Sequence, residues 1–424
     1  MRYAIVGNGA AGWTAAQTLK NLDPEGEIII FSDEPYRPYY RPLITNFVEE
    51  GTARNLFMPV EDGPGPAIRQ YLSQRLVGLE PQAKRLLGED GQTWDYDRLL
   101  LATGASPVIP ELPGWPGPGT FGLRTLADAE ALAQAAREAR QAVVLGAGRV
   151  GLKAAQALKS LGLAVTLVEL ENRLASMQFD ETAGEILAEA LMAAGFRLFL
   201  GETLTAVDRK GDRVVGITLT SGRTLPTDLV VAALGVRPNI ELAQKAGLAV
   251  NRGILVDEFL RTSDPNIYAA GDVAETTEFL TGQRLVSGLW TNAVEMGRIV
   301  GSNMAGASLT YPGAWAVLNS LEVAGIPTAA VGLTLPPPGD DYLVWQSRRG
   351  NTYRKLVFKG KVLVGALLVG DLEGVGVYTG LIRKKVPLKN LQDFQGEPRK
   401  VLVSWISRKL PLAPSLTSGC HAPG

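Results

Sequence analysis

The chain of 424 residues has one cysteine and one histidine, and both lie next to its C-terminal end, in SLTSGCHAPG at 415–424. One cysteine cannot form a disulfide within the chain or supply the several thiolates of a Cys-ligated iron–sulfur cluster. The Gly, Ser and Pro residues around Cys420 and His421 favour disorder at this end over a place in another subunit's site. The body of the chain therefore contains neither a thiol pair nor a histidine base.

A strong net charge and long apolar runs are also missing. The formal net charge of -1 gives no overall attraction to nucleic acid or to an anionic membrane. No uncharged apolar stretch reaches the roughly 18 residues of a membrane-spanning helix. The apolar N-terminus is too short and too rich in glycine for a signal peptide. Because a single cysteine also suits a reducing compartment, the chain is predicted to be cytoplasmic.

The first glycine-rich motif opens the chain, in RYAIVGNGAAGWTAAQTLKNL. Here G-x-G-x-x-G joins a predicted buried strand to a predicted helix. Such glycines allow a tight turn, close approach of the backbone to a diphosphate, and tight helix packing. The next predicted strand, EIIIFSDE, ends in Asp33 and Glu34, where a carboxylate would bind a ribose hydroxyl. The other nucleotide contacts predicted in this motif are Gly7, Gly9, Ala10, Ala11 and Gly12.

A second copy of the motif occupies residues 141–171, QAVVLGAGRVGLKAAQALKSLGLAVTLVELE. Its strand again ends in an acid, Glu169, which would bind a free ribose 2′-OH and repel a 2′-phosphate, so that NAD is favoured over NADP. The nearby Arg173 weakens this preference. The other predicted contacts are Gly146, Gly148, Val150 and Gly151. Two copies, each with strand, helix and acid, predict two dinucleotide sites.

Together with three further stretches, the two motifs resemble the FAD-dependent pyridine-nucleotide oxidoreductases. These stretches are LLLATGASPVIP at 99–110, LVVAALGVRPNI at 229–240 and IYAAGDVAE at 267–275. The resemblance implies FAD in the first motif and NADH in the second. It also implies FAD contacts at Thr103, Gly104, Gly271 and Asp272, and a contact with the nicotinamide half at Gly235 and Pro238.

The fold class implied is α/β, with two Rossmann-like three-layer dinucleotide-binding domains and a C-terminal α+β domain. The FAD-binding domain is expected to be discontinuous, at 1–112 and 244–312, with the NAD(H)-binding domain inserted at 113–243. The C-terminal domain is expected at 313–405, followed by a tail at 406–424.

The segment PYRPYYRPLITNF, at 35–47, lacks the Cys-x4-Cys pair that many family members carry there, which excludes thiol-based mechanisms at that place. This segment and GLWTNAVEMGRIVGSNMAG, at 288–306, are most similar to NADH:rubredoxin and ferredoxin reductases and to the NADH-oxidising part of nitrite reductases. In that group Arg41 would lie near the FAD phosphates or adenine. A helix starting near Trp290 would point its N-terminus at the flavin, with ordinary packing as the alternative for Trp290.

Lys153 stands where many relatives have a glutamate that faces the nicotinamide and flavin N5. A lysine there would stabilise the negative charge of reduced flavin or pair with a partner's carboxylate. The alternative is a solvated helix lysine. Lys153 is the single candidate for a catalytic side chain, and no metal site is predicted.

The function implied is oxidation of NADH through FAD, with electrons passed to a small one-electron carrier such as rubredoxin or ferredoxin, or to a redox enzyme that recruits the chain as a subunit. A cysteine-independent NADH oxidase that reduces oxygen is one alternative. A non-catalytic flavoprotein that acts as a redox sensor or scaffold is another. Relatives leave both a monomer and a homodimer open.

Charge is unevenly distributed, because the segment from residue 311 onward has 14 Lys and Arg against 7 Asp and Glu, whereas the rest has 28 against 36. Basic runs there would steer an acidic electron carrier to the flavin, unless they only face solvent. The runs are Arg348-Arg349, Arg354-Lys355, Arg383-Lys384-Lys385 and Arg399-Lys400. The stretch 399–412 suits a short amphipathic helix, for which docking on its own domain is favoured over peripheral membrane contact.

Overall fold

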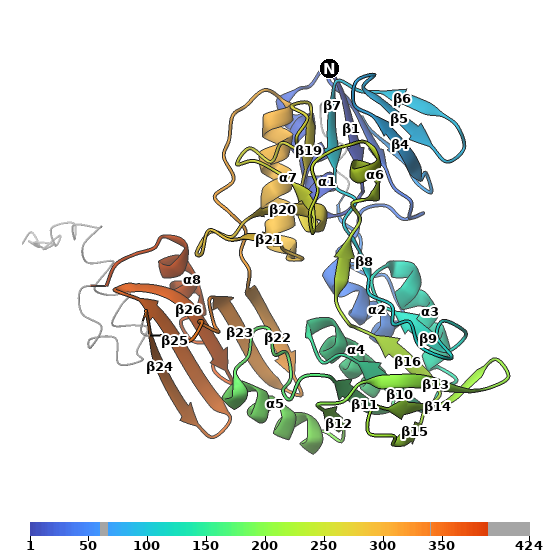
Figure 1. The fold of residues 1–424 in the computed structure, drawn as a ribbon, viewed down its shortest axis with the longest axis vertical. Coiled ribbons are helices and arrows are strands. Elements are labelled where there is room, and N and C mark those ends of the chain that lie inside the picture. The colour runs from blue at the N-terminus through green and yellow to red at the C-terminus, as the bar shows by residue number, and fades with distance from the viewer. Residues whose placement is uncertain (60–66, 340, 389–424) are drawn as a thin grey trace, which may run out of the picture. The chain divides into compact units, whose positions relative to one another are not determined.

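The computed structural model describes residues 1–59, 67–339 and 341–388, which form two compact units (Figure 1). The first unit comprises Met1–Leu318 and Val323–Gly325, and the second comprises Asn319–Glu322 and the described residues from Ile326 onward. The predicted helix at 399–412, the tail, and Cys420 and His421 lie outside the described residues. Within the described ranges, no helix is long and apolar enough to cross a membrane.

The first sheet of the larger unit has the strand order β19-β7-β1-β2-β3 and is parallel throughout. Apart from a charged first residue in each, the central strands β7, β1 and β2 consist of buried and almost entirely apolar residues, as expected of a parallel sheet covered on both faces. Helices α1 and α7 pack against each other beside it. The bounds are β1 Arg2–Val6, α1 Ala10–Leu22, β2 Glu27–Phe31, β3 Ile68–Tyr71, β7 Arg98–Leu101, β19 Ile267–Ala269 and α7 Trp290–Met304.

Smaller elements surround this sheet. An antiparallel sheet of β4, β5 and β6 follows β3, and β18, β20 and β21 form another small sheet. Their bounds are η1 Arg41–Leu43, α2 Ile44–Glu50, β4 Leu76–Glu80, β5 Arg85–Gly88, β6 Thr93–Asp95, α6 Glu241–Lys245, β18 Ile254–Leu255, η2 Gly271–Val273, β20 Ala274–Thr277 and β21 Arg284–Val286.

The second five-stranded sheet repeats the parallel arrangement, in the order β12-β11-β10-β16-β9. Helix α4 packs on β10, β11 and β16, and also against α2 of the N-terminal region. The antiparallel strands β13, β14 and β15 form a separate small sheet. The bounds are β9 Thr120–Gly122, α3 Leu126–Ala136, β10 Gln141–Leu145, α4 Arg149–Ser160, β11 Ala164–Glu169, α5 Glu181–Ala193, β12 Arg197–Leu200, β13 Leu204–Lys210, β14 Arg213–Leu219, β15 Thr224–Pro226 and β16 Leu229–Ala232.

Two short antiparallel strands, β8 Ala105–Pro107 and β17 Val236–Pro238, connect the two parallel sheets of the larger unit (Figure 1). The smaller unit is a sheet in the order β22-β23-β26-β25-β24, antiparallel from β23 to β24, with helix α8 packed on it. Its bounds are β22 Leu318–Val323, β23 Ile326–Gly332, β24 Tyr342–Arg349, β25 Thr352–Lys359, β26 Val362–Val369 and α8 Val375–Arg383. The predicted fold class is confirmed.

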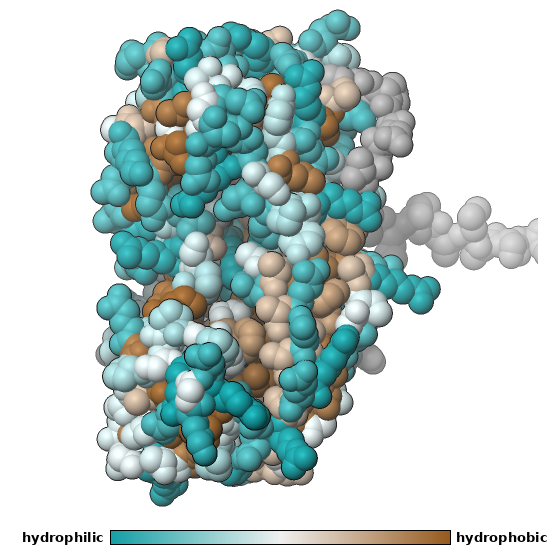
Figure 2. All heavy atoms as spheres, turned by 90° about the vertical axis from the view of Figure 1, so that its right-hand side faces the viewer, coloured by the Kyte–Doolittle hydropathy of each residue, from teal (hydrophilic) through white to brown (hydrophobic). Residues whose placement is uncertain are grey.

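Figure 2 shows one face of the molecule, on which hydrophilic side chains prevail and hydrophobic ones form several separate areas. Scattered apolar side chains of this kind are ordinary on a surface that meets water. The functional site must therefore be sought in specific side-chain arrangements.

Candidate functional site

The first glycine loop connects β1 to α1, and its three glycines lie in different surroundings. Gly7 has a φ of +113°, and a Cβ there would collide with the carbonyl oxygen of Ala102. A Cβ on Gly12 would collide with the Gly7 carbonyl oxygen, whereas one on Gly9 would meet no atom within 4 Å. Gly9 therefore borders open space at the N-terminus of α1, where Ala10 and Ala11 begin the helix. Free N–H groups and the positive dipole end favour a diphosphate there.

The second glycine loop, between β10 and α4, repeats this geometry. Gly146 has a φ of +94°, and a Cβ on Gly151 would collide with the Gly146 carbonyl oxygen. A Cβ on Gly148 would again meet nothing within 4 Å. Val150, in the first turn of α4, is exposed. Each loop thus presents an open helix N-terminus of the same kind.

The acid at the end of β11, Glu169, is hydrogen-bonded to the second glycine loop. Glu169 accepts a hydrogen bond from the Ala147 amide at 2.6 Å and another from the Glu171 amide at 3.0 Å. Its carboxylate is therefore fixed directly beside the loop that faces the open space.

The two acids that follow β2, Asp33 and Glu34, differ in their contacts. One Glu34 oxygen accepts a hydrogen bond from the Tyr39 hydroxyl at 2.6 Å, and the other pairs with the Arg41 guanidinium at 2.6 Å. Burial lowers the pKa of Arg41, but Tyr39 and Glu34 together outweigh it and raise that pKa above its usual value. Asp33, by contrast, is exposed. Of the two acids predicted to bind ribose, only Asp33 has its carboxylate outside this internal network.

Arg124 is a site residue for which the sequence offered no motif. Its guanidinium pairs with Asp272 at 2.7 Å and donates to the Ala105 carbonyl at 2.9 Å. A Cβ on Gly104 would lie 3.8 Å from the same guanidinium. Arg124 thus joins two predicted FAD stretches, and its own carbonyl accepts a hydrogen bond from Arg41 at 2.8 Å. Only the tertiary contact with Asp272, 148 positions away, reveals it.

The chain crosses between the two parallel sheets twice, next to β8 and next to β17, and these two segments are hydrogen-bonded to each other. The Thr103 hydroxyl donates to the Asn239 carbonyl at 2.8 Å, and the Asn239 side chain donates back to the Thr103 carbonyl at 2.9 Å. Gly235, with a φ of +99°, has nothing within 4 Å of an added Cβ. Pro238 lies in β17, which pairs with β8.

Each glycine loop with the helix N-terminus that follows it is called a cradle, and Gly271 and Trp290 lie where α7 meets the first cradle. Gly271 has a φ of +77°, and a Cβ there would come within 3.1 Å of the Ala11 Cβ. Trp290 is the first residue of α7, and its ring packs against Tyr40 with the ring centroids 5.5 Å apart. This is the packing contact that was the alternative for Trp290, and it leaves the N-terminus of α7 near the FAD stretches.

Lys153 lies on α4, one turn after Arg149, and its side chain is exposed. Within the described chain, it has no hydrogen bond or ion pair with a protein group. The structure therefore brings the glycine loops, the crossings, Arg124 and Asp272 together, and leaves Lys153 available to a bound molecule.

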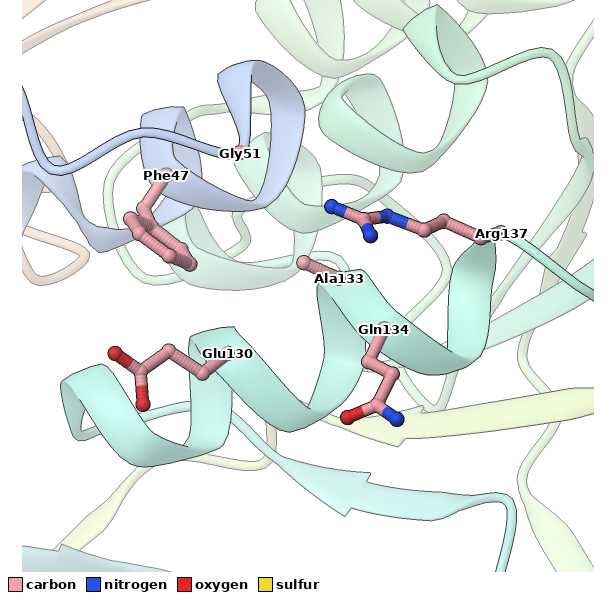
Figure 3. Close-up of a pocket in the computed structure, with 6 residues that line it drawn as sticks. All are labelled: Phe47, Gly51, Glu130, Ala133, Gln134 and Arg137. Carbon is pink, nitrogen blue, oxygen red and sulfur yellow. The ribbon is translucent and has the colours of Figure 1, made fainter.

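A hollow of about 290 Å³ lies elsewhere, between α2 and α3 (Figure 3). It is lined by Phe47, Gly51, Glu130, Ala133, Gln134 and Arg137. The Tyr36 hydroxyl donates to Glu130 at 2.7 Å, which raises the pKa of Tyr36 to about 12. None of the lining residues belongs to the predicted nucleotide contacts, so the cradles define the candidate site and this hollow does not.

Comparison with known proteins gives two family matches. Residues 1–297 match the pyridine nucleotide-disulphide oxidoreductase family, and residues 318–386 match the rubredoxin NAD+ reductase C-terminal domain. The assimilatory nitrate reductase electron transfer subunit of Bacillus subtilis (strain 168) is 32% identical over 87% of this chain and 48% of its own length. The chain thus spans about half the length of that relative.

Two further proteins match over nearly their whole length. The epsilon subunit of the NADH-dependent phenylglyoxylate dehydrogenase of Aromatoleum evansii is 31% identical over 94% of this chain and 96% of its own. The solved ferredoxin reductase of the CYP199A2 system from Rhodopseudomonas palustris has a TM-score of 0.84 and 30% identity, and the match covers 94% of this chain and 99% of that one.

Proposed function

Because this chain belongs to the pyridine nucleotide-disulphide oxidoreductase family, whose members use FAD and NAD(H), we propose that it oxidises NADH and passes the electrons through FAD to a small one-electron carrier protein. The expected family, the oxidoreductase class and the cofactor pair are confirmed. The carrier, the domain boundaries and the individual site residues belong to the proposal.

The observation that carries the proposal is that both cradles lie in one compact unit, whose residues include no cysteine. Bound FAD supplies a ring that accepts a hydride from NADH and releases electrons singly. The residues fit it, because Gly9 and Gly148 border open space, and Asn8 Oδ1 in the first loop is buried without a hydrogen-bond partner. With the only cysteine at position 420, outside the described residues, the electrons have no disulfide to enter.

FAD is assigned to 1–112 and 244–312, and NAD(H) to the inserted 113–243. In the first cradle Asp33 binds the ribose, since Glu34 holds Arg41 in position beside Arg124. Arg124 and Asp272 form the contacts to the ribityl and flavin portion together with Gly104 and Gly271. The N-terminus of α7, at Trp290, adds a positive dipole end. The matching diphosphate contacts are Gly7, Gly9, Ala10, Ala11 and Gly12.

In the second cradle the diphosphate lies at Gly146, Gly148, Val150 and Gly151, and Glu169 binds the ribose. The Glu169 carboxylate accepts a hydrogen bond from the Ala147 amide and has further lone pairs for a ribose 2′-OH, whereas it would repel a 2′-phosphate. Lys153 supplies a positive charge near the reacting rings. Replacing Lys153 with Glu should lower the flavin potential and slow hydride transfer, and an unchanged potential and rate would remove Lys153 from the mechanism.

The carrier's docking surface is the more specific part of the proposal. Arg348 and Arg349 on β24 are exposed, as are the residues from Arg383 to Lys385. The run Arg354-Lys355 does not contribute, because Arg354 pairs with Asp371 at 3.2 Å and Lys355 is buried. Arg399-Lys400 lies outside the described residues. The exposed basic runs, on a segment similar to the rubredoxin reductase C-terminal domain, suit an acidic carrier.

The test is the rate of NADH consumption by the FAD-loaded protein in air, with and without added rubredoxin or ferredoxin. Slow turnover in air with a large, salt-sensitive acceleration by the carrier is expected. Fast turnover that the carrier does not change would make oxygen the acceptor, as in an NADH oxidase. Retained FAD that NADH does not bleach would instead indicate a sensor or scaffold.

A further inference from the structure

Arg173 lies in the segment between β11 and α5, and its guanidinium bonds that segment to itself. Its Nε donates to the Phe179 carbonyl at 3.0 Å, and one terminal nitrogen donates to the Ser176 carbonyl at 3.3 Å. The other terminal nitrogen pairs with the exposed Glu181 carboxylate at 3.3 Å. All three guanidinium nitrogens are therefore used within residues 173–181.

The stem of Arg173 lies against helix α5. A Cβ added to Gly184 of that helix would come within 3.1 Å of the Arg173 Cβ, so even a methyl group there would press on the stem. Only 30% of the Arg173 side chain is exposed. The side chain is thus held at its base and at its end, unlike an arginine that extends into solvent.

The segment that Arg173 closes is bonded to the second cradle at Ala147, the residue between the first two glycines. The Ala147 amide donates to Glu169 at 2.6 Å, and the Ala147 carbonyl accepts from the Ala175 amide at 3.0 Å. In the first cradle the equivalent residue is Asn8, whose backbone makes neither bond within the described residues. The second cradle therefore has an anchor that the first one lacks.

The bond from Ala175 fixes the direction of a peptide group that borders the open space. The Ala147 carbonyl and the Gly148 amide belong to one planar trans peptide, so they point to opposite sides. The Gly148 amide consequently points away from Ala175, and in the described part of the chain it donates no hydrogen bond. Because a Cβ on Gly148 would meet nothing within 4 Å, this amide has room for a phosphate oxygen.

Ala175 makes its bond in a conformation that needs support. Its φ of +45° is left-handed, which is unfavourable for a residue other than glycine. The Ala175 carbonyl accepts the amides of Gln178 and Phe179, at 3.0 and 3.1 Å, and so closes a turn. Arg173 binds two other carbonyls of the same turn, those of Ser176 and Phe179. Arg173 is therefore the side chain that stabilises this turn.

We propose that Arg173 is a positioning residue for NAD(H): it holds the turn whose Ala175 amide bonds the second glycine loop, and so keeps the Gly148 amide directed at the diphosphate. It acts through the fork of its hydrogen bonds to carbonyls. Its charge does not weaken the preference for NAD, because the guanidinium nitrogens are already bonded within the segment. The inference rests on the proposed function, since it requires NAD(H) in the second cradle.

Two ligands of the FAD-loaded full-length protein separate a positioning role from binding of a ribose 2′-phosphate. ADP-ribose carries the diphosphate and a free 2′-OH, and 2′-phospho-ADP-ribose carries the additional phosphate. The variants are Arg173→Gln, which removes both charge and fork, and Arg173→Lys, which keeps the charge alone. The matched control is Arg140→Gln, an exposed arginine just before β10, at the opposite end of that strand from the glycine loop.

Both Arg173 variants should raise both dissociation constants about tenfold, as expected if the turn keeps its position in about a tenth of the free molecules. The ratio of the two constants should stay unchanged. Hydrogen exchange in residues 173–179 should be faster in the free variants and return to the original rate at saturating ADP-ribose, because the ligand selects the native turn. The control should match the original protein in every measurement.

A selective loss of 2′-phospho-ADP-ribose binding in Arg173→Gln that Arg173→Lys restores would overturn the proposal and make Arg173 a cation for the 2′-phosphate. Unchanged constants in both variants, or faster exchange throughout β10, α4 and β11, would also overturn it. If Arg173→Gln does not fold, Arg173→Lys alone decides, because constants equal to those of the original protein would show that the charge suffices.

None of these measurements uses a carrier or turnover, so failure of the carrier proposal leaves them readable. Absence of binding of either ligand to the original protein would instead remove the assignment of NAD(H) to the second cradle, and with it the proposed function.

Discussion

The two cradles share their glycine geometry but differ in what surrounds it. The second cradle is closed within its own sheet, because the carboxylate of Glu169 at the end of β11 accepts a hydrogen bond from the loop amide of Ala147. The first cradle is tied to a distant segment, since Glu34 holds Arg41, and Arg41 donates to the carbonyl of Arg124 before α3. The same backbone motif is therefore combined with a local acid in one case and with a long-range ion-pair network in the other.

This difference agrees with the proposed assignment, in which NADH leaves the second cradle in every turnover and FAD stays bound in the first, whose arginines also hold neighbouring segments together. Substitutions matched between the cradles can therefore separate the two functions.

The largest effect is expected from Gly12→Ala compared with Gly151→Ala. In each case the added methyl group would collide with the carbonyl oxygen of the loop's first glycine, Gly7 or Gly146. Gly12→Ala should be purified without FAD, as measured by absorbance near 450 nm. Gly151→Ala should retain FAD but lose at least about 100-fold in the rate constant of its reduction by NADH, roughly 3 kcal/mol. FAD retained in Gly12→Ala at the original level would contradict the assignment of the first cradle.

The next effect concerns Arg124→Gln, which removes the partner of a mostly buried Asp272 carboxylate. We expect the free energy of unfolding of the FAD-free protein to fall by about 1–3 kcal/mol, since a buried charged acceptor loses its hydrogen bond. The FAD dissociation constant should rise as well. Arg237→Gln, on the crossing strand β17 and exposed, serves as control. Urea unfolding followed by circular dichroism measures the free energy of unfolding, and FAD titration measures the dissociation constant. Equal free energies of unfolding for Arg124→Gln and the original protein would contradict the ion pair with Asp272.

Glu34→Gln and Glu169→Gln should have opposite consequences. Glu34→Gln leaves Arg41 uncompensated and should lower the free energy of unfolding by about 1–2 kcal/mol, with an unchanged ratio of kcat/KM for NADH to that for NADPH. Glu169→Gln should reduce that ratio by about tenfold, because the repulsion of a 2′-phosphate is lost. An unchanged ratio in Glu169→Gln would show that this acid does not bind the ribose.

The smallest effect is expected outside both cradles, in Arg348→Gln combined with Arg349→Gln. Removing two exposed charges should slow association with an acidic carrier about two- to fivefold at low salt and by less at high salt. Turnover with ferricyanide, which needs no carrier surface, should stay unchanged. Stopped-flow kinetics at two ionic strengths distinguish this result from general damage, and an equal loss with both acceptors would contradict a docking role.

The two glycine loops and the fold class could be predicted from the sequence because their signals are local. A glycine loop, its strand and its helix lie within about thirty consecutive residues in such a unit, and the absence of a thiol requires no structure at all. Glu169 was equally clear as the acid that ends the strand after the second loop, and the structure bonds it to that loop. Which of Asp33 and Glu34 is held in an internal network, however, could not be read from the sequence, since it depends on Tyr39 and Arg41.

The ion pair of Arg124 with Asp272 was decided by tertiary structure alone. Arg124 is an isolated arginine in the sequence, without a motif around it. The two residues meet because the chain crosses between two parallel sheets and returns, which brings the start of α3 and η2 to one place. Charge interactions act through space over several ångströms, whereas sequence patterns record only neighbours along the chain.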